Sequence, residues 1–282
     1  LFPYTTLFRS REAGVRNLER TITSVLRKCA RKIASGEAEN VSVTGTSLEK
    51  LLGPRMVKPE FLNRTNAIGI ANGLAWTSIG GETLPIEVQV IDNGSGKIIV
   101  TGSLGDVMKE SAQLAITYAR VHAAEYGIDS ERLKKCDLHI HAPEGAVPKD
   151  GPSAGVTLTT ALISCLSGIP VRGDVAMTGE ITLHGNVLPI GGLREKSMAA
   201  YREGMKTVLI PKDNVSDLYE VDDEVKKNIE FLPMSNLSQV LAAALLKPKA
   251  VSAGHPRTRK VKPAEAAALP QTAEKPQPGA VC

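Results

Sequence analysis

The chain has 282 residues, and its 42% hydrophobic and 23% charged content is ordinary for a globular protein. Aromatic residues make up 4%, which leaves little material for a surface that stacks nucleic-acid bases. The net charge of +4 comes from the last segment: from residue 247 onward, seven Lys or Arg accompany two Glu. The remainder is close to neutral, so no basic face for DNA is predicted. No run of 18 apolar residues occurs, and no membrane-spanning segment is predicted.

The four cysteines lie far apart and form no C-x-x-C pair (Cys29, Cys136, Cys165 and Cys282). This spacing argues against a zinc site or a disulfide framework and fits a reducing compartment. The N-terminus also lacks the pattern of a secretory signal. We therefore expect a cytoplasmic location, with no metal or cofactor bound by this stretch of chain.

The first 65 residues do not form a domain by themselves. Residues 1–10 look like the in-frame translation of a common sequencing adapter, so we expect an artefact there and a natural protein that extends upstream. From Arg11 to about Ala34, apolar residues recur at steps of three and four, which predicts an amphipathic helix. Residues 41–44 favour a strand, and residues 47–52 favour a short helix ended by Gly53. We interpret residues 11–65 as the end of a preceding domain.

Strands and helices alternate between residues 66 and 246. In chain order we predict strands at 67–71 and 84–91 with turns at Gly80-Gly81 and Asn93-Gly94, a helix at 105–126, a strand at 137–141, a helix at 154–166, a β-rich stretch at 175–190, a helix at 193–203, a strand at 207–211 and a helix at 237–246. This alternation predicts one α+β domain, a mixed sheet with helices. From residue 247, six prolines with Ala and Lys predict a disordered tail.

The densest candidate motif is the loop at residues 148–155, PKDGPSAG, which leads directly into an apolar helix. Ser153 would therefore lie at a helix N-terminus, where free N–H groups favour negative charge and could hold an acyl-transfer oxyanion. The same position is also the common place for a serine that only caps the helix. Loop geometry alone leaves both interpretations open.

The segment GPSAG also fits the G-x-S-x-G pattern of the α/β-hydrolase nucleophile elbow. That elbow needs an apolar strand directly before it and a histidine downstream. Here the preceding residues are loop-like, His184 lies in a predicted turn and His255 lies in the predicted tail. The elbow interpretation is disfavoured, and any base for Ser153 must be another residue type.

Lys196 is a candidate for that base. On the predicted helix after Gly191-Gly192, Leu193 and Ser197 share one side that Lys196 borders, whereas Arg194 points elsewhere. Burial lowers the pKa of a lysine, and a neutral lysine can serve as the base in a Ser–Lys pair. A solvated lysine that extends from a surface helix fits the same pattern.

Three further motifs are weaker candidates for a functional site. His139 and His141 share one face of a predicted strand, but without a third ligand they are better interpreted as hydrogen-bonding or core histidines. Residues 94–97, GSGK, lack the flanking residues of a phosphate loop and are interpreted as a hairpin turn. Residues 47–50 fit S-x-x-K, but without the companion motifs of penicillin-interacting enzymes we interpret Ser47 as a helix cap.

Five segments together resemble one family, the Lon ATP-dependent proteases. These are REAGVRNLER (11–20), GLAWTSIGGE (73–82), TGSLGDVMKESAQ (101–113), DLHIHAPEGAVPKDGPSAG (137–155) and AMTGEITLHGNVLPIGGLREK (176–196). They occur in the expected order and the resemblance covers roughly residues 11–246. It implies that residues 66–246 are a Lon-type proteolytic domain, and residues 11–65 the end of an AAA+ small helical subdomain.

The resemblance also implies the chemistry. Ser153 would be the acyl-forming nucleophile, Lys196 its general base, and Thr178 a residue that orients the lysine amine. Full-length members use ATP and Mg²⁺, assemble as hexamers and degrade unfolded polypeptides. This sequence holds no G-x-x-x-x-G-K-[ST] motif, so we expect at most cleavage of small or unstructured peptides by this chain.

Two other function classes remain as alternatives. Lon-like domains also occur as non-catalytic modules in a DNA-repair ATPase family, which would make this chain a scaffold or interaction module. The basic tail around residues 257–262 could bind nucleic acid without sequence preference. The pairing of Ser153 with Lys196 argues against the scaffold, and a solvated tail argues against the nucleic-acid role.

Overall fold

The computed structural model describes residues 15–54, 65–77, 80–143 and 147–246. The predicted artefact at 1–10 and the predicted tail at 247–282 lie outside these residues and stay predictions. None of the helices in the described ranges combines the length and the apolar character needed to cross a membrane.

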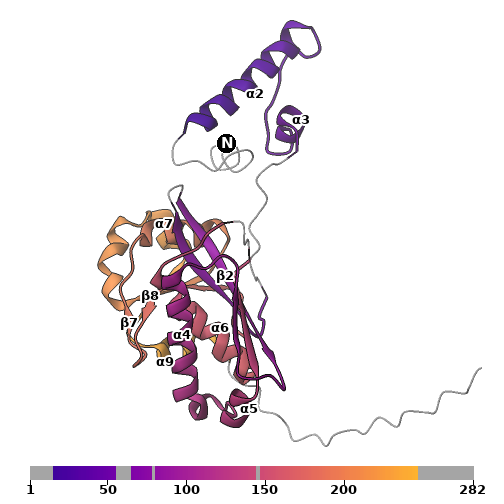
Figure 1. The fold of residues 1–282 in the computed structure, drawn as a ribbon. Coiled ribbons are helices and arrows are strands. Elements are labelled where there is room, and N and C mark those ends of the chain that lie inside the picture. The colour runs from indigo at the N-terminus through magenta and orange to yellow at the C-terminus, as the bar shows by residue number, and fades with distance from the viewer. Residues whose placement is uncertain (1–14, 55–64, 78–79, 144–146, 247–282) are drawn as a thin grey trace, which may run out of the picture. The chain divides into compact units, whose positions relative to one another are not determined.

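Two helices near the N-terminus pack on each other (Figure 1). Helix α2 (Arg16–Ala34) is amphipathic, as predicted, and Val25 on its apolar side contacts the leucines of α3 (Leu48–Leu52). Gly53 ends α3 with a φ of 84°, which glycine adopts without strain. The strand predicted at 41–44 is wrong. No strand pairs with this segment, and Val43 packs instead against the α2–α3 cluster.

A seven-stranded mixed sheet forms the centre of the remaining described chain. Its order is β3-β4-β2-β1-β5-β8-β9. The strands are β1 (Ile70–Thr77), β2 (Gly80–Ile91), β3 (Ile98–Thr101), β4 (Asp137–His141), β5 (Val175–Met177), β8 (Thr207–Pro211) and β9 (Glu230–Met234). β1, β5, β8 and β9 run parallel to one another, β2 is antiparallel to β1 and β4, and β3 is parallel to β4. A separate short hairpin joins β6 (Glu180–Ile181) and β7 (Val187–Leu188). The predicted α+β class is confirmed.

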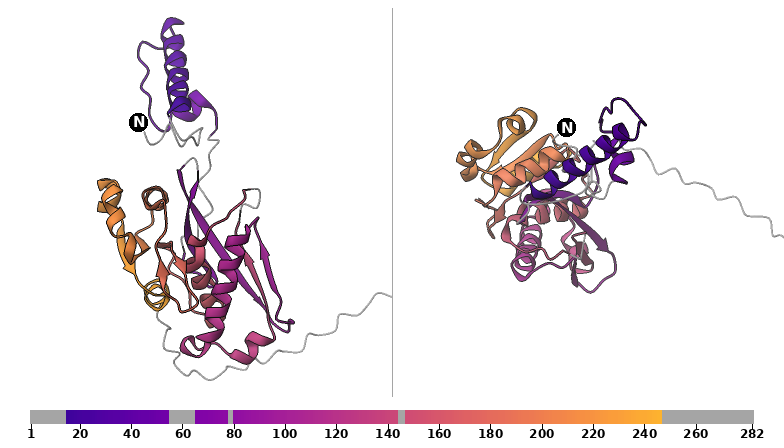
Figure 2. Two further views of the ribbon diagram at one scale, coloured as in Figure 1. Left: turned by 60° about the vertical axis from the view of Figure 1, so that its left-hand side comes forward. Right: turned by 90° about the horizontal axis from the view of Figure 1, so that it is seen from above.

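Helices cover both faces of the parallel half of this sheet (Figures 1 and 2). The helices are α4 (Asp106–Val121), α5 (Ser130–Lys134), α6 (Gly155–Ser167), α7 (Leu193–Arg202), α8 (Asp223–Asn228) and α9 (Leu237–Ala244), with 3-10 turns at Ala123–Tyr126, Pro152–Ala154, Lys212–Asn214 and Ser216–Glu220.

Alternating side chains of the strands enter two separate cores. In β8, Leu209 joins the core formed with α4, α6 and α9, whereas Val208 and Ile210 join the core formed with α7 and α8. This is the period-2 pattern of a strand buried on both faces. Helix α7, which carries Lys196, and helix α6, which directly follows the turn with Ser153, therefore lie on opposite faces of the sheet.

Two turn predictions need correction. Gly80 and Gly81 do not form a turn but begin β2, opposite Thr77 and Trp76 of β1. Residues 94–97 are not the turn of a hairpin, because β2 and β3 both pair with β4 and not with each other. The loop between them is held by Asp137, whose carboxylate accepts hydrogen bonds from the backbone N–H groups of Ser95 and Lys97. These bonds hold the pKa of Asp137 below its usual range.

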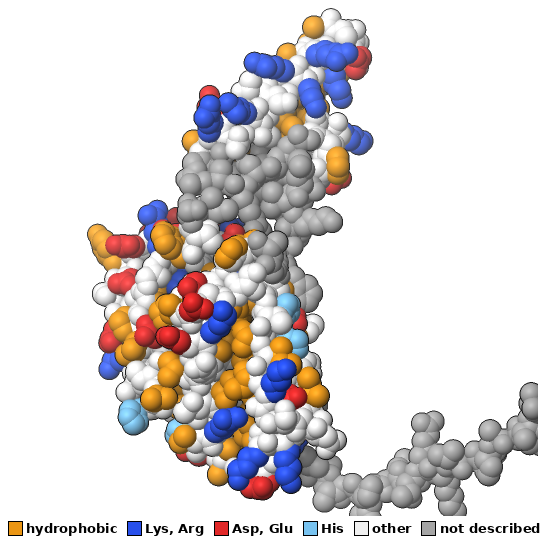
Figure 3. Space-filling model, in the orientation of Figure 1, with side chains coloured by type: hydrophobic (Ala, Val, Ile, Leu, Met, Phe, Trp, Pro, Cys, Tyr) orange, Lys and Arg blue, Asp and Glu red, His pale blue; other side chains and the backbone are white. Residues whose placement is uncertain are grey.

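Charged side chains are distributed unevenly over the described chain. Basic residues follow one another along α2, as the blue side chains in Figure 3 show. Over the part that contains the sheet, the face shown in Figure 3 carries acidic and basic side chains interspersed with apolar ones. This mixture agrees with the nearly neutral charge outside the last segment.

Candidate active site

The candidate residues meet at the carboxyl end of β5. Thr178 directly follows this strand, Ser153 precedes α6 on one face of the sheet, and Lys196 lies in the first turns of α7 on the other. In sheets with parallel strands, ligand sites form outside the carboxyl ends of the strands, where helices of opposite faces diverge. The fold therefore provides a reason for residues 43 positions apart to share a site.

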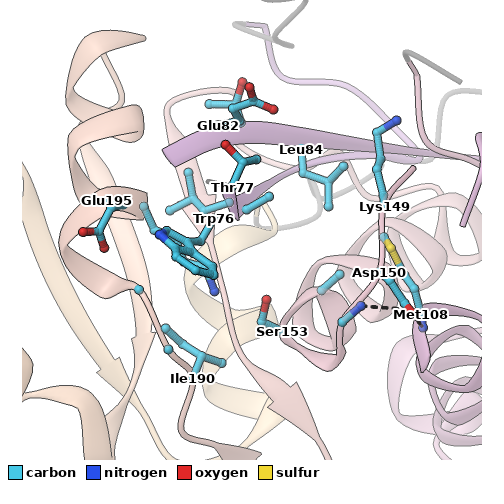
Figure 4. Close-up of a pocket in the computed structure, with 18 of the residues that line it drawn as sticks. Trp76, Thr77, Glu82, Leu84, Met108, Lys149, Asp150, Ser153, Ile190 and Glu195 are labelled. Atoms are coloured by element: carbon cyan, nitrogen blue, oxygen red, sulfur yellow. Dashed lines mark hydrogen bonds between the residues drawn. The ribbon is translucent and has the colours of Figure 1, made fainter. Parts of the chain in front are cut away.

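Backbone pairing and one carboxylate hold the loop before Ser153. The N–H of Lys149 donates to the carbonyl of Ser103 (3.0 Å), and its carbonyl accepts from Gly105 N (2.7 Å). Oδ1 of Asp150 accepts from the N–H groups of Met108 (3.0 Å) and Gly151 (2.9 Å), and Figure 4 shows Asp150 beside Met108.

Asp150 thus caps α4 from a distant part of the chain. Met108 is the third residue of α4, whose N-cap position holds Gly105 and no capping side chain. A Cβ at Gly105 would lie 2.2 Å from the Asp150 carboxyl carbon, so glycine makes room for this external cap. Sequence reasoning missed this role. The sequence did carry a signal for it, because the helix begins at a glycine without a capping side chain and so needs a cap from elsewhere.

Ser153 does not cap α6, so the capping interpretation is wrong. Ala154 occupies the N-cap position, and Ser153 lies in the 3-10 turn before it. Its carbonyl accepts from Gly179 N (2.9 Å) and Thr178 Oγ1 (3.3 Å). Its half-buried hydroxyl makes no hydrogen bond to any residue that the structure describes and points into an open space (Figure 4).

Lys196 is buried, and the interpretation as a solvated lysine is wrong. Its residue surface is 3% exposed, whereas Arg194, two positions earlier on α7, is exposed. Nζ donates a hydrogen bond to Thr178 Oγ1 (3.1 Å). Burial lowers the pKa of Lys196 from 10.5 to about 8, because the ammonium form loses its hydration.

Thr178 links the two candidate residues. Its hydroxyl accepts from Lys196 Nζ and donates to the carbonyl of Ser153. The residue is 1% exposed, and its backbone N–H donates to Leu209 of β8. Ser153, Thr178 and Lys196, which lie in three separate segments of sequence, are thereby brought together.

A cavity of about 630 Å³ opens at this site. Both Ser153 and Lys196 line it, and the β1–β2 hairpin forms one wall through Trp76 and Leu84 (Figure 4). The start of α4 contributes Met108 on the other side. The cavity is large enough to admit part of an extended peptide chain beside the Ser153 hydroxyl.

The other sequence motifs lie outside this cavity and have structural roles. His139 and His141 both hydrogen-bond to Thr101 Oγ1, at 2.9 and 2.8 Å. His184 lies in the turn between β6 and β7. Ser47 stands at the N-cap of α3, but its hydroxyl bonds to Thr44 and not to the helix. In the described ranges, no three His, Cys, Asp or Glu side chains are grouped so that they could hold a metal ion.

Comparison with protein families finds two matching regions. Residues 42–247 match the Lon protease (S16) C-terminal proteolytic domain, and residues 9–41 match the Lon protease AAA+ ATPase lid domain. The boundary that we predicted at residue 65 is not tested by the fold and stays a prediction.

Three curated relatives illustrate the similarity. The chain is 52% identical over 238 residues to a Lon protease of Brevibacillus choshinensis, covering 84% of this chain and 30% of the relative. It is 52% identical over 242 residues to one of Desulforamulus reducens (86% and 30%), and 49% identical over 242 residues to one of Chloroflexus aggregans (84% and 29%). The chain thus spans about 30% of the length of these relatives. With a model match over residues 42–247 added to these identities, the chain belongs to the Lon protease family.

Proposed function

We propose that this chain is a serine endopeptidase domain in which Ser153 is the nucleophile and Lys196 the general base. One observation carries the proposal: a serine hydroxyl without a hydrogen bond to any described residue and a buried lysine amine line the same cavity, and Thr178 hydrogen-bonds both the lysine amine and the backbone carbonyl of the serine. Acyl transfer by a Ser–Lys pair needs these components.

The reaction has two stages. Ser153 Oγ attacks the carbonyl carbon of a peptide bond while the neutral amine of Lys196 accepts the hydroxyl proton. The resulting ammonium returns this proton to the nitrogen of the leaving amine, the C–N bond breaks, and an acyl-enzyme ester remains on Ser153. Water, activated by Lys196, then hydrolyses this ester. Backbone N–H groups around Ser153 stabilise the oxyanion in both stages.

Burial makes Lys196 suitable for this role. With a pKa of about 8, roughly half of the amine is neutral at pH 8, whereas an ordinary lysine is almost entirely protonated there. Thr178 fixes the amine: a neutral Nζ that donates one N–H to this hydroxyl keeps its lone pair free for the serine proton.

We further propose the context of this activity: degradation of unfolded polypeptides, in a cytoplasmic hexamer, with ATP hydrolysed by an ATPase module. The match of residues 9–41 to an ATPase lid supports the last point. The residues present do not fit a complete nucleotide site, because no phosphate-binding loop motif occurs in the sequence. No step of the peptidase mechanism above passes through ATP or Mg²⁺.

A non-catalytic Lon-like scaffold is the alternative function. Such a module would gain nothing from a buried lysine, since burying an ammonium without a carboxylate partner destabilises a fold. A measurement of peptide hydrolysis distinguishes the scaffold from the peptidase.

The test uses the full chain with an unstructured fluorogenic peptide and with a peptide boronate that forms an adduct with active serines. We expect hydrolysis and the adduct in the parent, and a loss of at least ~10³-fold in kcat/KM for Ser153→Ala and Lys196→Ala. Ser216→Ala and Lys206→Ala, both outside the cavity, are the matched controls. A parent chain that gives neither signal, or a Ser153→Ala variant that retains hydrolysis, would contradict the proposal.

A further inference from the structure

We propose that Gly81 and Arg202 are positioning residues for Lys196, because together they fix the first turns of α7 against the β1–β2 hairpin. The inference rests on the proposed role of Lys196 as base. Neither residue lines the cavity, so both act through the helix that carries the base and not through the substrate.

Gly81 makes the closest backbone approach of any described glycine. A Cβ at this position would lie 1.9 Å from the carbonyl oxygen of Glu195, 2.4 Å from its carbonyl carbon and 3.0 Å from Lys196 N. These three atoms belong to the single peptide group that joins Glu195 to Lys196. Strand β2 thus rests directly on the backbone that carries the base.

Space, and not backbone conformation, is the reason for glycine at this position. Gly81 is not among the residues with positive φ, so alanine could adopt its backbone angles. The adjacent Gly80 is the opposite case: its φ is 127°, but nothing lies within 4 Å of its Cβ position. A methyl group at Gly81 must therefore push the Glu195–Lys196 peptide away by about 1 Å, since Cβ contacts below about 3 Å do not occur.

Arg202 makes the second attachment, at the C-terminal end of α7. Its Nη2 donates a hydrogen bond to the carbonyl of Gly81 (3.1 Å). The same residue of β2 thereby contacts α7 near its start, through the Glu195–Lys196 peptide, and at its last residue. Two contacts separated along a helix fix both its position and its rotation relative to the strand.

Displacement of α7 would change the surroundings of Lys196 directly. Thr178, the partner of Nζ, follows β5 and is bonded to β8, so it does not move with α7. A shift of about 1 Å lengthens the 3.1 Å bond between Nζ and Thr178 and admits water to a side chain that is now 3% exposed. More hydration favours the ammonium, and therefore weakens the base.

The same segment of β2 also forms the cavity wall. Glu82, Thr83 and Leu84, which directly follow Gly81, line the cavity. One short stretch of strand therefore contacts the backbone that carries the base and also lines the cavity.

The test measures Lys196 itself as well as turnover. In the full chain, the ¹³Cε resonance of Lys196, assigned by its absence in Lys196→Met, is titrated to obtain the pKa of the amine; kcat and KM are measured on the peptide. For Gly81→Ala we expect a pKa above about 8, toward 10.5, and a fall in kcat of about 100-fold with a smaller change in KM. For Arg202→Ala we expect a fall in kcat of about tenfold, and we expect Arg202→Lys to restore part of this loss.

Gly73→Ala is the matched control for loss of packing. A Cβ at Gly73 would lie 2.8 Å from the Leu84 carbonyl and 3.0 Å from Thr157, so this variant strains the same sheet without touching α7. It should lower thermal stability and leave the pKa of Lys196 unchanged.

The outcomes separate this inference from the proposed function. A folded Gly81→Ala chain in which the pKa of Lys196 matches the parent overturns the positioning role, even if turnover falls. Should Gly81→Ala fail to fold, an unchanged pKa in Arg202→Ala overturns it. A peptidase that does not depend on Lys196 instead refutes the proposed base, while the titration still reports whether Gly81 and Arg202 hold the lysine.

Discussion

The loop that carries Ser153 and the helix that carries Lys196 differ in how the fold holds them. Hydrogen bonds hold the loop, through the Lys149 backbone, the Asp150 carboxylate and the Ser153 carbonyl. Close packing holds the start of the helix, where the Glu195–Lys196 peptide group lies directly against Gly81 and the lysine is buried, and one hydrogen bond from Arg202 holds its end. Ser153, the proposed nucleophile, remains half exposed, and Lys196, the proposed base, does not.

This difference matches the two chemical tasks. A nucleophile must meet the substrate, so its segment needs an accessible side chain on a fixed backbone. A lysine base must lose its proton near neutral pH, and dehydration is the means available here, since burial is the only cause that lowers its pKa. Ser153 should therefore respond to changes in hydrogen bonding, and Lys196 to changes in volume and hydration.

The largest contrast is expected between removal of the base and removal of the nucleophile. Lys196→Met should lose at least ~10³-fold in kcat/KM yet unfold at the same or a higher temperature near neutral pH, because it removes a buried ammonium. Ser153→Ala should lose similar activity while its free energy of unfolding stays within about 0.5 kcal/mol of the parent. Peptide hydrolysis and thermal denaturation at pH 7 measure both; a strongly destabilised Lys196→Met chain would contradict this contrast.

The buried amine of Lys196 should make both the turnover and the stability of the parent chain depend on pH. Turnover should rise about tenfold per pH unit below pH 8 and level off above it, as the amine becomes neutral. Stability should rise between about pH 8 and 10.5, because in this window the unfolded chain binds a proton that the native Lys196 does not. The shift corresponds to about 3 kcal/mol, which is lost again as pH falls through 10.5 to 8. Denaturant titrations of parent and Lys196→Met, compared at each pH, isolate this contribution.

Thr178→Val tests the link between the two segments. It removes the acceptor for Lys196 Nζ and the donor to the Ser153 carbonyl, with little change in volume. We expect a fall in kcat of about tenfold or more, and a recovery of most of it in Thr178→Ser, which keeps the hydroxyl. Equal activities of the valine and serine variants would show that the hydroxyl has no part in orienting the amine.

The smallest effect is expected at the external cap of α4. Asp150→Ala should lower the free energy of unfolding by about 1 kcal/mol, the usual effect of losing a helix cap, and should raise the mobility of the loop before Ser153. Asp150→Asn, which retains the accepting oxygen, is the control. Chemical denaturation together with the hydrogen-exchange rate of the Met108 amide measures both, and an unchanged exchange rate would argue against the cap.

Strong local patterns predicted the regular elements well. The strands Asp137–His141 and Thr207–Pro211 were predicted with the bounds that the structure shows, since their apolar residues stand out from polar flanks. The short elements β3, α5 and α8 were missed, and so was β9 (Glu230–Met234), in which Pro233 argues against a strand. The structure explains the proline: β9 is the last strand of the sheet, and an edge strand tolerates proline.

The site was less accessible to reasoning from pattern. Residue spacing left Ser153 open as a cap and Lys196 open as a surface lysine, and Thr178 was suggested by family resemblance alone. These residues come together because segments on opposite faces of the sheet meet at one end of it. Local periodicity in the sequence does not encode that meeting. Gly81 was interpreted as a turn residue, because Glu195, whose carbonyl oxygen would lie 1.9 Å from a Cβ at Gly81, is 114 positions away in the sequence.

The order in which the sheet can assemble has a consequence for the nascent chain. β1 pairs with β2 through a short hairpin, but its other neighbour, β5, follows about a hundred residues later. Contacts between such distant segments form late, because closing the long loop is entropically unfavourable. Thr178 follows β5 and α7 follows Thr178, so the dyad assembles only once this late pairing is made. In a partly folded chain, Ser153 would thus lack the base that we propose for it, and such a chain would be inactive as a peptidase.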